Sequence, residues 1–395
     1  GKAPSDDCIL NEMLKHGGEE ALTSLTLLLN LIWSLEVLPS DWKTAPVCPV
    51  FKKGSFFDPK NYRPIALLSN LFKLLERVMD ARIRAVFVII VEQCGFRPHF
   101  GTEMQLLRLS VLMQHCKSVG QGMWMAFLDL EEAFERAWRP GILYRLWLGG
   151  VKGKCWRLVS EMLTNTYAYV RSNFGDTVKF KVGEGVLQGS VLAAILFIIF
   201  INPLVEALMP YCPVINSLRI GAQLFADDLF LLGLHPSQRH KLVYLTLIWA
   251  EKWKASVKDV KSSFLTTTGA DSQSTSVITS TFMEVAKLFH LGLGVDRNGV
   301  FSLGHVFAKV EKAVRRFHSL TRSGVRLGGI RADACAEVYK SAAMSVLTYA
   351  LALCPPESNR VTRLNTAQAL FANKFLGLPK DTPGCIALSE LGFTD

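Results

Sequence analysis

Cysteine pairs of the Cys-x-x-Cys type are missing from this sequence of 395 residues, and its nine cysteines are scattered. An odd number of widely spaced cysteines fits neither a disulfide framework nor a zinc site. Tandem repeats are also absent, and the first residues, 1–7, are polar and acidic, unlike a signal peptide. These absences predict an intracellular protein in a reducing compartment, which in a eukaryotic host means cytoplasm and nucleus.

Apolar runs of membrane-spanning length are missing as well. The stretches 22–32, 85–91 and 191–201 are mostly apolar, but each is shorter than the roughly 20 residues that a membrane helix needs. Hydrophobic residues nevertheless make up 50% of the chain, so it can bury a large core and divide into subdomains. We therefore predict no membrane segment and interpret 191–201 as part of a core helix.

Basic residues outnumber acidic ones. The chain has 44 Lys and Arg against 34 Asp and Glu, a net charge of +10, which favours a polyanionic partner. Within 305–323 apolar residues recur at helical spacing, while Lys309, Lys312 and Arg316 occupy other faces. This pattern predicts a helix that either grips a nucleic-acid backbone or carries an ordinary solvated charged face.

Two adjacent carboxylates, Asp227 and Asp228, lie inside the apolar run 224–232. Burying like charges side by side costs on the order of several kcal/mol each without compensation. A divalent cation with oxygen ligands is the simplest compensation. The run predicts a strand, a tight turn carrying the Asp pair and a second strand. An ordinary hairpin turn is the alternative interpretation, because Asp tolerates turn geometry.

A third carboxylate, Asp129, ends the continuous apolar stretch 123–128, which has the length of a buried strand. An acid at the end of such a strand can meet the Asp227 hairpin on a neighbouring strand. Two-metal phosphoryl transfer needs carboxylates from separate elements that bridge two ions about 4 Å apart. Capping of the following helix is the alternative role for Asp129.

A glycine-containing block, 185–190, lies between these acids in the sequence. Glycines before a helix let the backbone approach a ligand closely, and Gln188 next to Gly189 offers both a donor and an acceptor. In this order, the blocks around Asp129, Gln188 and Asp227 resemble motifs A, B and C of a reverse transcriptase. The chain is similar to the reverse transcriptase domain of non-LTR (LINE-type) retrotransposons over nearly all of its length. Further matching blocks lie at 42–47, 51–54, 61–65, 95–98, 102, 249–253, 261–262, 291–293 and 376–379.

This resemblance implies an RNA-directed DNA polymerase, a nucleotidyltransferase that extends a primer 3′-hydroxyl with dNTPs on an RNA template. The fold it implies is an α+β right-hand polymerase. Fingers and the N-terminal part of the palm would occupy 1–120. A palm with an antiparallel sheet and motifs A to D would occupy 121–285, and a helical thumb 286–395.

The resemblance also implies roles for individual residues. Asp129 and Asp227 would be the principal ligands of two Mg²⁺ ions, with Mn²⁺ as an alternative metal, and Asp228 would lie close to the primer end. One ion would lower the pKa of the primer hydroxyl, and the other would hold the triphosphate.

The remaining implied roles concern the nucleotide. Lys53 and Arg63 would contact the triphosphate, and Gln188 and Gly189 would bind the nucleotide. Phe134 would be the steric gate that excludes a 2′-hydroxyl. Lys261 would protonate pyrophosphate. Without the family resemblance, Lys53 and Arg63 fit a solvated loop. Phe134 then fits a core residue, and Lys261 a surface lysine.

The chain departs from the family pattern at several positions. Ser5 and Cys8 stand where the family has glycine, Glu135 where motif A ends in Asp or Asn, Val191 where motif B has proline, and Val257 where motif D has Asn. These departures indicate drift. A degenerate copy that only binds nucleic acid, a group II intron-like maturase and an RNA-dependent RNA polymerase are the alternatives, and Phe134 argues against the last. With no endonuclease region or zinc knuckle, we expect a fragment of a larger polyprotein or a truncated copy.

Overall fold

A computed structural model describes most of the chain, which divides into two compact units. Lys261 lies outside the described residues, as does the side chain of Lys309. The described residues are 4–258, 262–267, 282–300, 303–322, 334, 337–338, 340–349, 358–379 and 382–390. The first unit consists of Gly1–Gly101, Trp124–Phe264 and Ser272–Met283, and the second of Thr102–Met123, Leu265–Asp271 and Glu284–Asp395.

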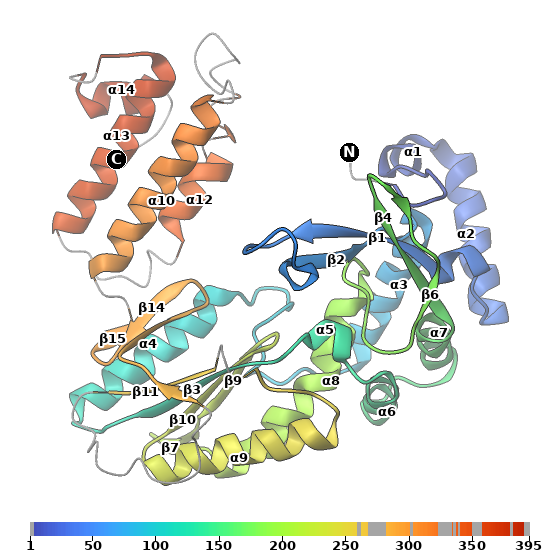
Figure 1. Cartoon of the computed structure of the whole chain (residues 1–395), viewed down its shortest axis with the longest axis horizontal. Helices are drawn as coiled ribbons and strands as arrows, with labels where there is room; N and C mark the ends of the chain where they lie inside the picture. Colours follow the sequence, from blue (N-terminus) through green and yellow to red (C-terminus); the bar gives the residue numbers. More distant parts are fainter. Residues whose placement is uncertain are drawn as a thin grey trace. The chain divides into compact units, whose positions relative to one another are not determined.

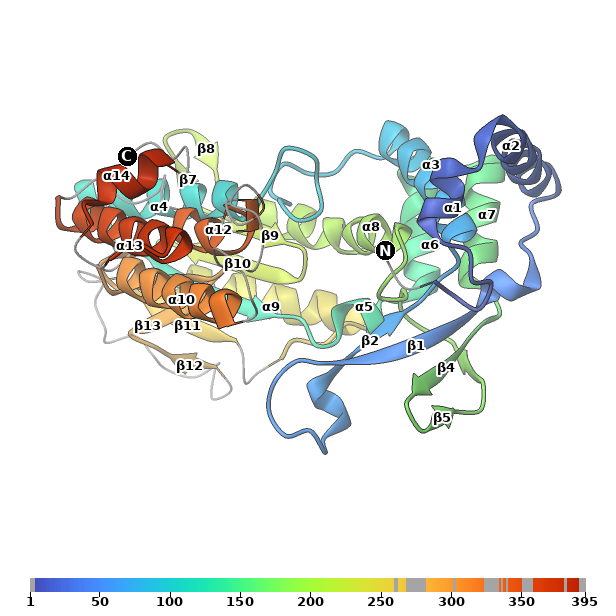
Figure 2. The same ribbon diagram turned by 90° about the horizontal axis from the view of Figure 1, so that it is seen from above.

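The first unit contains a sheet, here called the outer sheet, in which β1 lies between β2 and β4. β1 pairs antiparallel with β2 and parallel with β4, and the short strands β5 and β6 pair with β4. The strands are β1 (Thr44–Phe51), β2 (Tyr62–Ala66), β4 (Thr166–Ser172), β5 (Gly175–Asp176) and β6 (Phe180–Val182). The hairpin between β1 and β2 projects beyond the sheet (Figure 2).

The first unit also contains helices. α3 begins after Ser69, whose hydroxyl accepts hydrogen bonds from the amides of Leu71 and Phe72 at 3.1 and 3.5 Å, the usual way to satisfy the first amides of a helix. The helices are α1 (Asn11–His16), α2 (Gly18–Leu35), α3 (Asn70–Val86), α5 (Ala133–Arg136), α6 (Arg139–Leu148), α7 (Gly153–Leu163), α8 (Leu192–Leu208) and α9 (Pro236–Lys252), with 3₁₀ turns η1 (Ser40–Lys43), η2 (Pro59–Asn61) and η3 (Met209–Tyr211).

A second sheet, the central sheet, has the strand order β12-β11-β3-β10-β9. β10 pairs antiparallel with both β3 and β9, and α9 packs against β10 and β3 (Figure 1). The strands are β3 (Trp124–Asp129), β9 (Ala222–Phe225), β10 (Asp228–Gly233), β11 (Ser263–Thr266) and β12 (Met283–Glu284), and a small ribbon is formed by β7 (Val214–Ile215) and β8 (Leu218–Arg219). The predicted α+β class and the antiparallel sheet are confirmed.

Helix α8 is the core of the first unit. It is hydrophobic on every side, a pattern typical of a helix surrounded by protein, and nearly all of its residues are buried. Within the described part of the chain, Leu192–Tyr211 is the one helical stretch long and apolar enough to cross a membrane, and 78% of the window tested is buried inside the protein. The predicted core helix is therefore confirmed.

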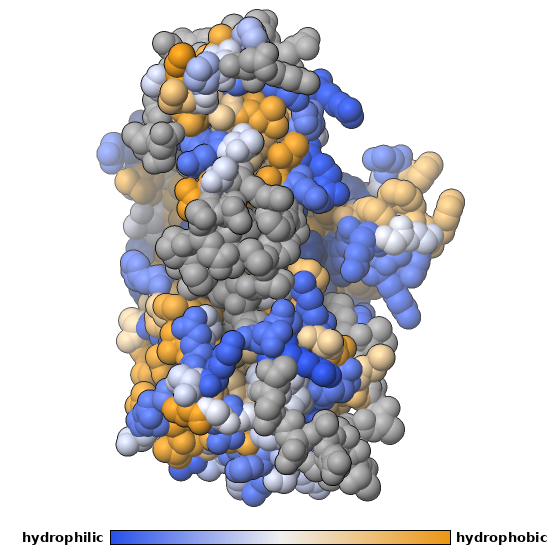
Figure 3. All heavy atoms as spheres, turned by 90° about the vertical axis from the view of Figure 1, so that its left-hand side faces the viewer, coloured by the Kyte–Doolittle hydropathy of each residue, from blue (hydrophilic) through white to orange (hydrophobic). Residues whose placement is uncertain are grey.

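Hydrophobic and hydrophilic side chains are interspersed on the face of the molecule seen in Figure 3.

The second unit combines a helix and a small sheet with a group of helices. Phe317 of α10 packs on Phe371 of α13, with ring centroids 4.7 Å apart, and Ala313, Leu347 and Ala367 complete this core. The amphipathic helix predicted around 305–323 is thus confirmed. The elements are α4 (Thr102–Ser118), β13 (Lys287–His290), β14 (Leu293–Asp296), β15 (Gly299–Val300), α10 (Leu303–Arg322), η5 (Lys340–Met344), α12 (Ser345–Thr348), α13 (Ser358–Leu376) and α14 (Gly384–Glu390).

Candidate active site

Three aspartates lie at one end of the central sheet. Asp129 is the last residue of β3, and its direct cross-strand partner is Asp228, the first residue of β10. Opposed residues of an antiparallel pair project from the same face, with Cβ atoms about 5 Å apart. Phe225 pairs with Asp228, so Ala226 and Asp227 form a two-residue turn. The predicted strand–turn–strand is confirmed, with Asp227 in the turn and Asp228 already in the strand.

The turn is held by a buried glutamine, Gln93, which sequence reasoning missed. Its side-chain Oε1 accepts hydrogen bonds from the amides of Ala226 (2.9 Å) and Gly95 (2.8 Å), and its Nε2 donates to the carbonyl of Ala226 at 3.4 Å. Gln93 is fully buried, while Ala226 has a φ of +56°, a conformation that costs a non-glycine residue energy. The amide side chain therefore fixes the backbone next to Asp227.

The segment around Gln93 lies along β9. The amide of Cys94 donates to the carbonyl of Leu224 at 2.8 Å, and the amide of Leu224 donates to the carbonyl of Glu92 at 3.0 Å. A Cβ atom on Gly95 would lie 2.3 Å from the amide nitrogen of Ala226, so only glycine fits there. This close approach gives a physical reason for the glycine in the block 95–98.

On its other side, Asp129 is tied to the segment that follows α9. Its carbonyl accepts a hydrogen bond from the amide of Lys258 at 2.7 Å, and its amide donates to the hydroxyl of Ser262 at 3.2 Å. Val257 forms a backbone bridge with Leu130, a contact that uses no side chain. The predicted motif D segment thus contacts Asp129 through Ser262. The preceding residue, Lys261, lies outside the described part of the chain.

The predicted glycine-containing block joins α5 to the outer sheet. The amide of Val186 donates to the carbonyl of Phe134 at 2.8 Å, and the carbonyl of Gln188 accepts from the amide of Ala66 at 2.6 Å. Cβ atoms on Gly185 and Gly189 would lie 2.1 Å and 2.2 Å from backbone carbonyl oxygens, and both glycines have positive φ. The close approach that we expected of these glycines is made here to neighbouring backbone.

Gln188 and Phe134 are both predicted to contact the nucleotide. Gln188 belongs to the glycine-containing block, and Phe134 belongs to α5. The Nε2 of Gln188 donates to Oε1 of Glu135 at 2.5 Å. Phe134 is half-buried, stacks on Phe197 with ring centroids 4.8 Å apart and meets the edge of Phe96 at 5.9 Å. Its ring is therefore packed among aromatic side chains and retains some exposure, which fits both interpretations given for it.

Glu76, on α3, caps the block and the start of α8. Its carboxylate accepts hydrogen bonds from the hydroxyl of Ser190 and, at 2.9 Å, from the amide of Val191. The side chain is buried, and desolvation raises its pKa to about 7 against the opposing effect of these hydrogen bonds. Sequence reasoning missed Glu76, although an acid beside Phe72 and Met79 on the apolar face of a helix is a usable signal.

Arg139 fixes the chain just before the block. Its guanidinium donates to the carbonyls of Gly185 (2.8 Å), Leu163 (2.6 Å) and Val182 (2.7 Å) and to the hydroxyl of Thr166. Burial lowers its pKa. Because the described partners are neutral oxygens, the arginine acts as a fork of hydrogen-bond donors.

The predicted phosphate-binding residues lie on exposed surfaces. Lys53 is in the β1–β2 hairpin, and Arg63 is on β2 opposite Val50. In the second unit, Lys312 and Arg316 are exposed on α10. Among the described residues, no group of three or more His, Cys, Asp or Glu side chains converges closely enough to hold a metal ion by itself.

A family model decides the classification. The model of the reverse transcriptase (RNA-dependent DNA polymerase) family matches residues 50–307, well over half of the chain. The chain belongs to the reverse transcriptase family. All three carboxylates and the glycine-containing block lie inside the matched part.

Curated relatives indicate the branch of the reverse transcriptase family that resembles this chain. It is 29% identical over 328 residues to the RNA-directed DNA polymerase from mobile element jockey of Drosophila funebris, covering 78% of this chain and 35% of that protein. It is 28% identical over 279 residues to the probable RNA-directed DNA polymerase from transposon X-element of Drosophila melanogaster, covering 66% and 29%. The resemblance to non-LTR retrotransposon enzymes is confirmed, and the chain spans about a third of these relatives.

A solved structure supports the fold alone. The telomerase of Candida tropicalis in complex with a TWJ fragment of telomeric RNA matches with a TM-score of 0.50 and 11% identity, over 93% of this chain and 64% of that one. At this identity the match concerns chain topology only. It agrees with the predicted α+β polymerase fold.

The departures from the reverse transcriptase pattern now have structural descriptions. Cys8, at a family glycine, has a φ of +54°, so a side chain occupies a conformation that favours glycine. Val191, at the family proline, donates the amide hydrogen that Glu76 accepts, and proline lacks that hydrogen. Glu135 contacts Gln188. Asp6, in the same N-terminal block as Cys8, accepts from Arg171 at 2.6 Å.

Proposed function

We propose that this chain is an RNA-directed DNA polymerase that extends a primer 3′-hydroxyl with dNTPs on an RNA template, as part of a non-LTR retrotransposon protein. The observation that carries the proposal is the opposed pair Asp129 and Asp228, with Asp227 in the adjoining turn. Membership of the reverse transcriptase family and the non-LTR relatives support the choice of template and substrate.

The donor set fits a pair of Mg²⁺ ions, or Mn²⁺ in their place. Mg²⁺ in polymerase sites is held by one or two carboxylates together with substrate phosphates, not by a cage of protein ligands. Asp129 and Asp228, on adjacent strands, and Asp227, in the adjoining turn, supply hard oxygen donors, which suits this partial coordination. When bound, such ions lower the pKa of the primer hydroxyl and neutralise the leaving pyrophosphate.

The other predicted residues serve the nucleotide. The primer 3′-oxygen forms a bond to the α-phosphorus while the bond from that phosphorus to pyrophosphate breaks. Lys53 and Arg63 offset the charge of the triphosphate, Gln188 and Gly189 border the incoming nucleotide, and Phe134 lies under its sugar. Lys261 donates a proton to the leaving pyrophosphate.

The division into fingers (1–120), palm (121–285) and thumb (286–395) belongs to the same proposal. The antiparallel central sheet with its carboxylates supports a palm. The amphipathic helix α10 supports a thumb, because Ala313 and Phe317 are buried while Lys312 and Arg316 are exposed. In this proposal Lys312, Arg316 and the predicted Lys309 bind the template–primer backbone.

Primer extension tests the proposal. Extension on an RNA template with dNTPs and Mg²⁺ should occur for the unaltered chain and fall by at least about a hundredfold for Asp227→Asn, because removing a metal ligand costs several kcal/mol of transition-state stabilisation. Asp176→Asn, which alters an exposed carboxylate of the β4–β5 hairpin, is the matched control and should extend normally. Equal extension by Asp227→Asn would overturn the assignment.

A nucleic-acid-binding remnant is the second candidate. The bond between Gln188 and Glu135 favours it, because the amide predicted to face the nucleotide is already engaged by a residue that departs from the family pattern. Tight binding of template–primer without any extension, in Mg²⁺ and in Mn²⁺, would support this candidate. Extension restored by Glu135→Asp would identify the engaged amide as the cause.

A further inference from the structure

The tip of the β1–β2 hairpin places two phenylalanine rings in solvent. Phe57 is 97% exposed and Phe56 is 68% exposed. These two residues are adjacent in the sequence, on a hairpin that projects beyond the sheet (Figure 2). Exposed apolar groups that are concentrated in this way mark sites of binding more often than scattered exposed residues do.

The tip is well ordered by its own hydrogen bonds. Nδ2 of Asn61 donates to the carbonyl of Ser55 at 2.9 Å, and the hydroxyl of Tyr62 donates to the carbonyl of Phe56 at 2.9 Å. The ring of Phe56 stacks on Phe51 with centroids 4.2 Å apart and an interplanar angle of 23°. The rings are therefore presented on a preorganised scaffold, which reduces the entropy lost when a ligand binds.

Basic residues flank the two phenylalanines in the sequence. Lys52, Lys53, Lys60 and Arg63 are all exposed, and none of them forms an ion pair with another residue in the described part of the chain. The one acid in the loop, Asp58, uses its carboxylate to accept a hydrogen bond from the amide of Lys60 at 3.0 Å. Unpaired cations beside exposed aromatic rings are complementary to a polyanion with flat apolar groups.

We propose that this tip binds unpaired nucleic acid, with bases stacked on Phe57 and Phe56 and phosphates held by Lys52 and Lys60. Stacking on aromatic side chains requires bases that are free of a partner strand. Resting on the function proposed above, the occupant is the unpaired part of the template strand. The site differs from the carboxylate centre in its residues and in its ligand, because it takes bases and not the triphosphate.

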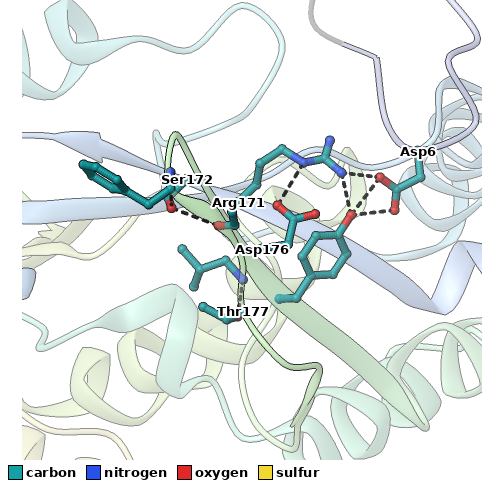
Figure 4. Close-up of polar contacts among 9 residues, drawn as sticks. Asp6, Arg171, Ser172, Asp176 and Thr177 are labelled. Atoms are coloured by element: carbon teal, nitrogen blue, oxygen red, sulfur yellow. Dashed lines mark hydrogen bonds and ion pairs between the residues drawn. The ribbon is translucent and has the colours of Figure 1, made fainter.

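Another exposed phenylalanine, on a different hairpin, provides a matched control. Phe174, at the tip of the β4–β5 hairpin, is 102% exposed. The cation nearest to it in the sequence, Arg171, forms ion pairs with Asp6 at 2.6 Å and Asp176 at 3.6 Å (Figure 4). The β4–β5 tip thus has an exposed ring whose neighbouring cation is already neutralised.

Fluorescence anisotropy without dNTPs tests the proposal. A labelled primer–template duplex with an unpaired 5′ template extension of about eight nucleotides is compared with the same duplex made blunt. We expect Phe57→Ala to weaken binding of the extended duplex about tenfold and to leave the blunt duplex unchanged. Phe57→Trp should restore the affinity, and Phe174→Ala should alter neither ligand.

Three results would overturn the proposal. They are an equal loss on blunt and extended duplexes, an equal loss for Phe174→Ala, and unchanged affinity for Phe57→Ala. Because Phe57 is almost fully exposed, its truncation should leave the melting temperature unchanged. Because binding is measured without synthesis, a chain that cannot polymerise still gives a clear result, so failure here is distinguishable from failure of the proposed activity.

Discussion

Two hairpins of the first unit, β9–β10 and β1–β2, are stabilised in opposite ways. The β9–β10 turn is held by the buried side chain of Gln93, 133 residues away from Ala226 in the sequence. The β1–β2 tip is held by near neighbours, such as Asn61 and Ser55, six residues apart. The turn beside the paired carboxylates is thus fixed by long-range contacts, while the solvent-exposed tip is fixed by local ones.

This difference has an energetic consequence. A polar group whose hydrogen bonds are buried costs more to disrupt than one that water can replace. Changes around the β9–β10 turn and the glycine-containing block should therefore affect the free energy of unfolding strongly, while changes at the β1–β2 tip should chiefly affect binding. The following substitutions test that contrast.

Replacement of Gln93 should have the largest effect on stability. Gln93→Leu leaves the amides of Gly95 and Ala226 and the carbonyl of Ala226 without their partner, so we expect a loss of roughly 3–5 kcal/mol in the free energy of unfolding. Urea denaturation measures this loss. The matched change at the exposed tip, Asn61→Leu, should cost less than about 1 kcal/mol. Similar losses for both variants would remove the distinction between the two hairpins.

Glu76 should make stability depend on pH. Its pKa is raised from 4.5 to about 7 in the folded protein, so the folded state retains a proton that the unfolded state releases. The contribution of Glu76 to stability is therefore greatest below pH 4.5 and falls as the pH rises to about 7, by on the order of 3 kcal/mol. Urea denaturation of the unaltered chain and Glu76→Gln at several pH values measures this dependence.

The glutamine variant should lack that fall and exceed the unaltered chain in stability at pH 8. Glu20→Gln, on the exposed surface of α2, is the control and should reproduce the pH dependence of the unaltered chain. A Glu76→Gln variant that follows the same pH curve would show that another group titrates.

Substitution of Cys8 should have the smallest effect on the free energy of unfolding. Cys8→Gly relieves a side chain at φ +54°, and after the added freedom of the unfolded chain we expect a gain of roughly 0.5–1 kcal/mol. Cys8→Ala keeps the Cβ atom and should change little. If alanine stabilises as much as glycine does, the thiol and not the backbone conformation is responsible.

Local patterns in the sequence were sufficient for several elements. The apolar stretch ending at Asp129 predicted β3, and the run around Asp227 predicted β9, the turn and β10. The residues after Ser190 predicted the core helix α8, and the periodicity around Phe317 predicted α10. These predictions succeeded because strand and helix periodicity depend on neighbouring residues.

Contacts between distant residues could not be predicted in this way. Nothing near Gln93 in the sequence indicates that its side chain meets Ala226, and the branched hydrogen bonds of Arg139 are equally hidden. Glu76 offered one signal, a charge on an apolar helix face, but its partners Ser190 and Val191 follow more than a hundred residues later.

The sequence by itself determined the family and the order of its motifs, because motif residues and element periodicity are written in short segments. Only the tertiary structure decided that Asp228 is the strand partner of Asp129, that Gln188 is engaged by Glu135, and that Phe57 is exposed while Phe134 is packed. Strand register, burial and side-chain pairing depend on which distant segments fold together, and those relations are properties of the folded chain.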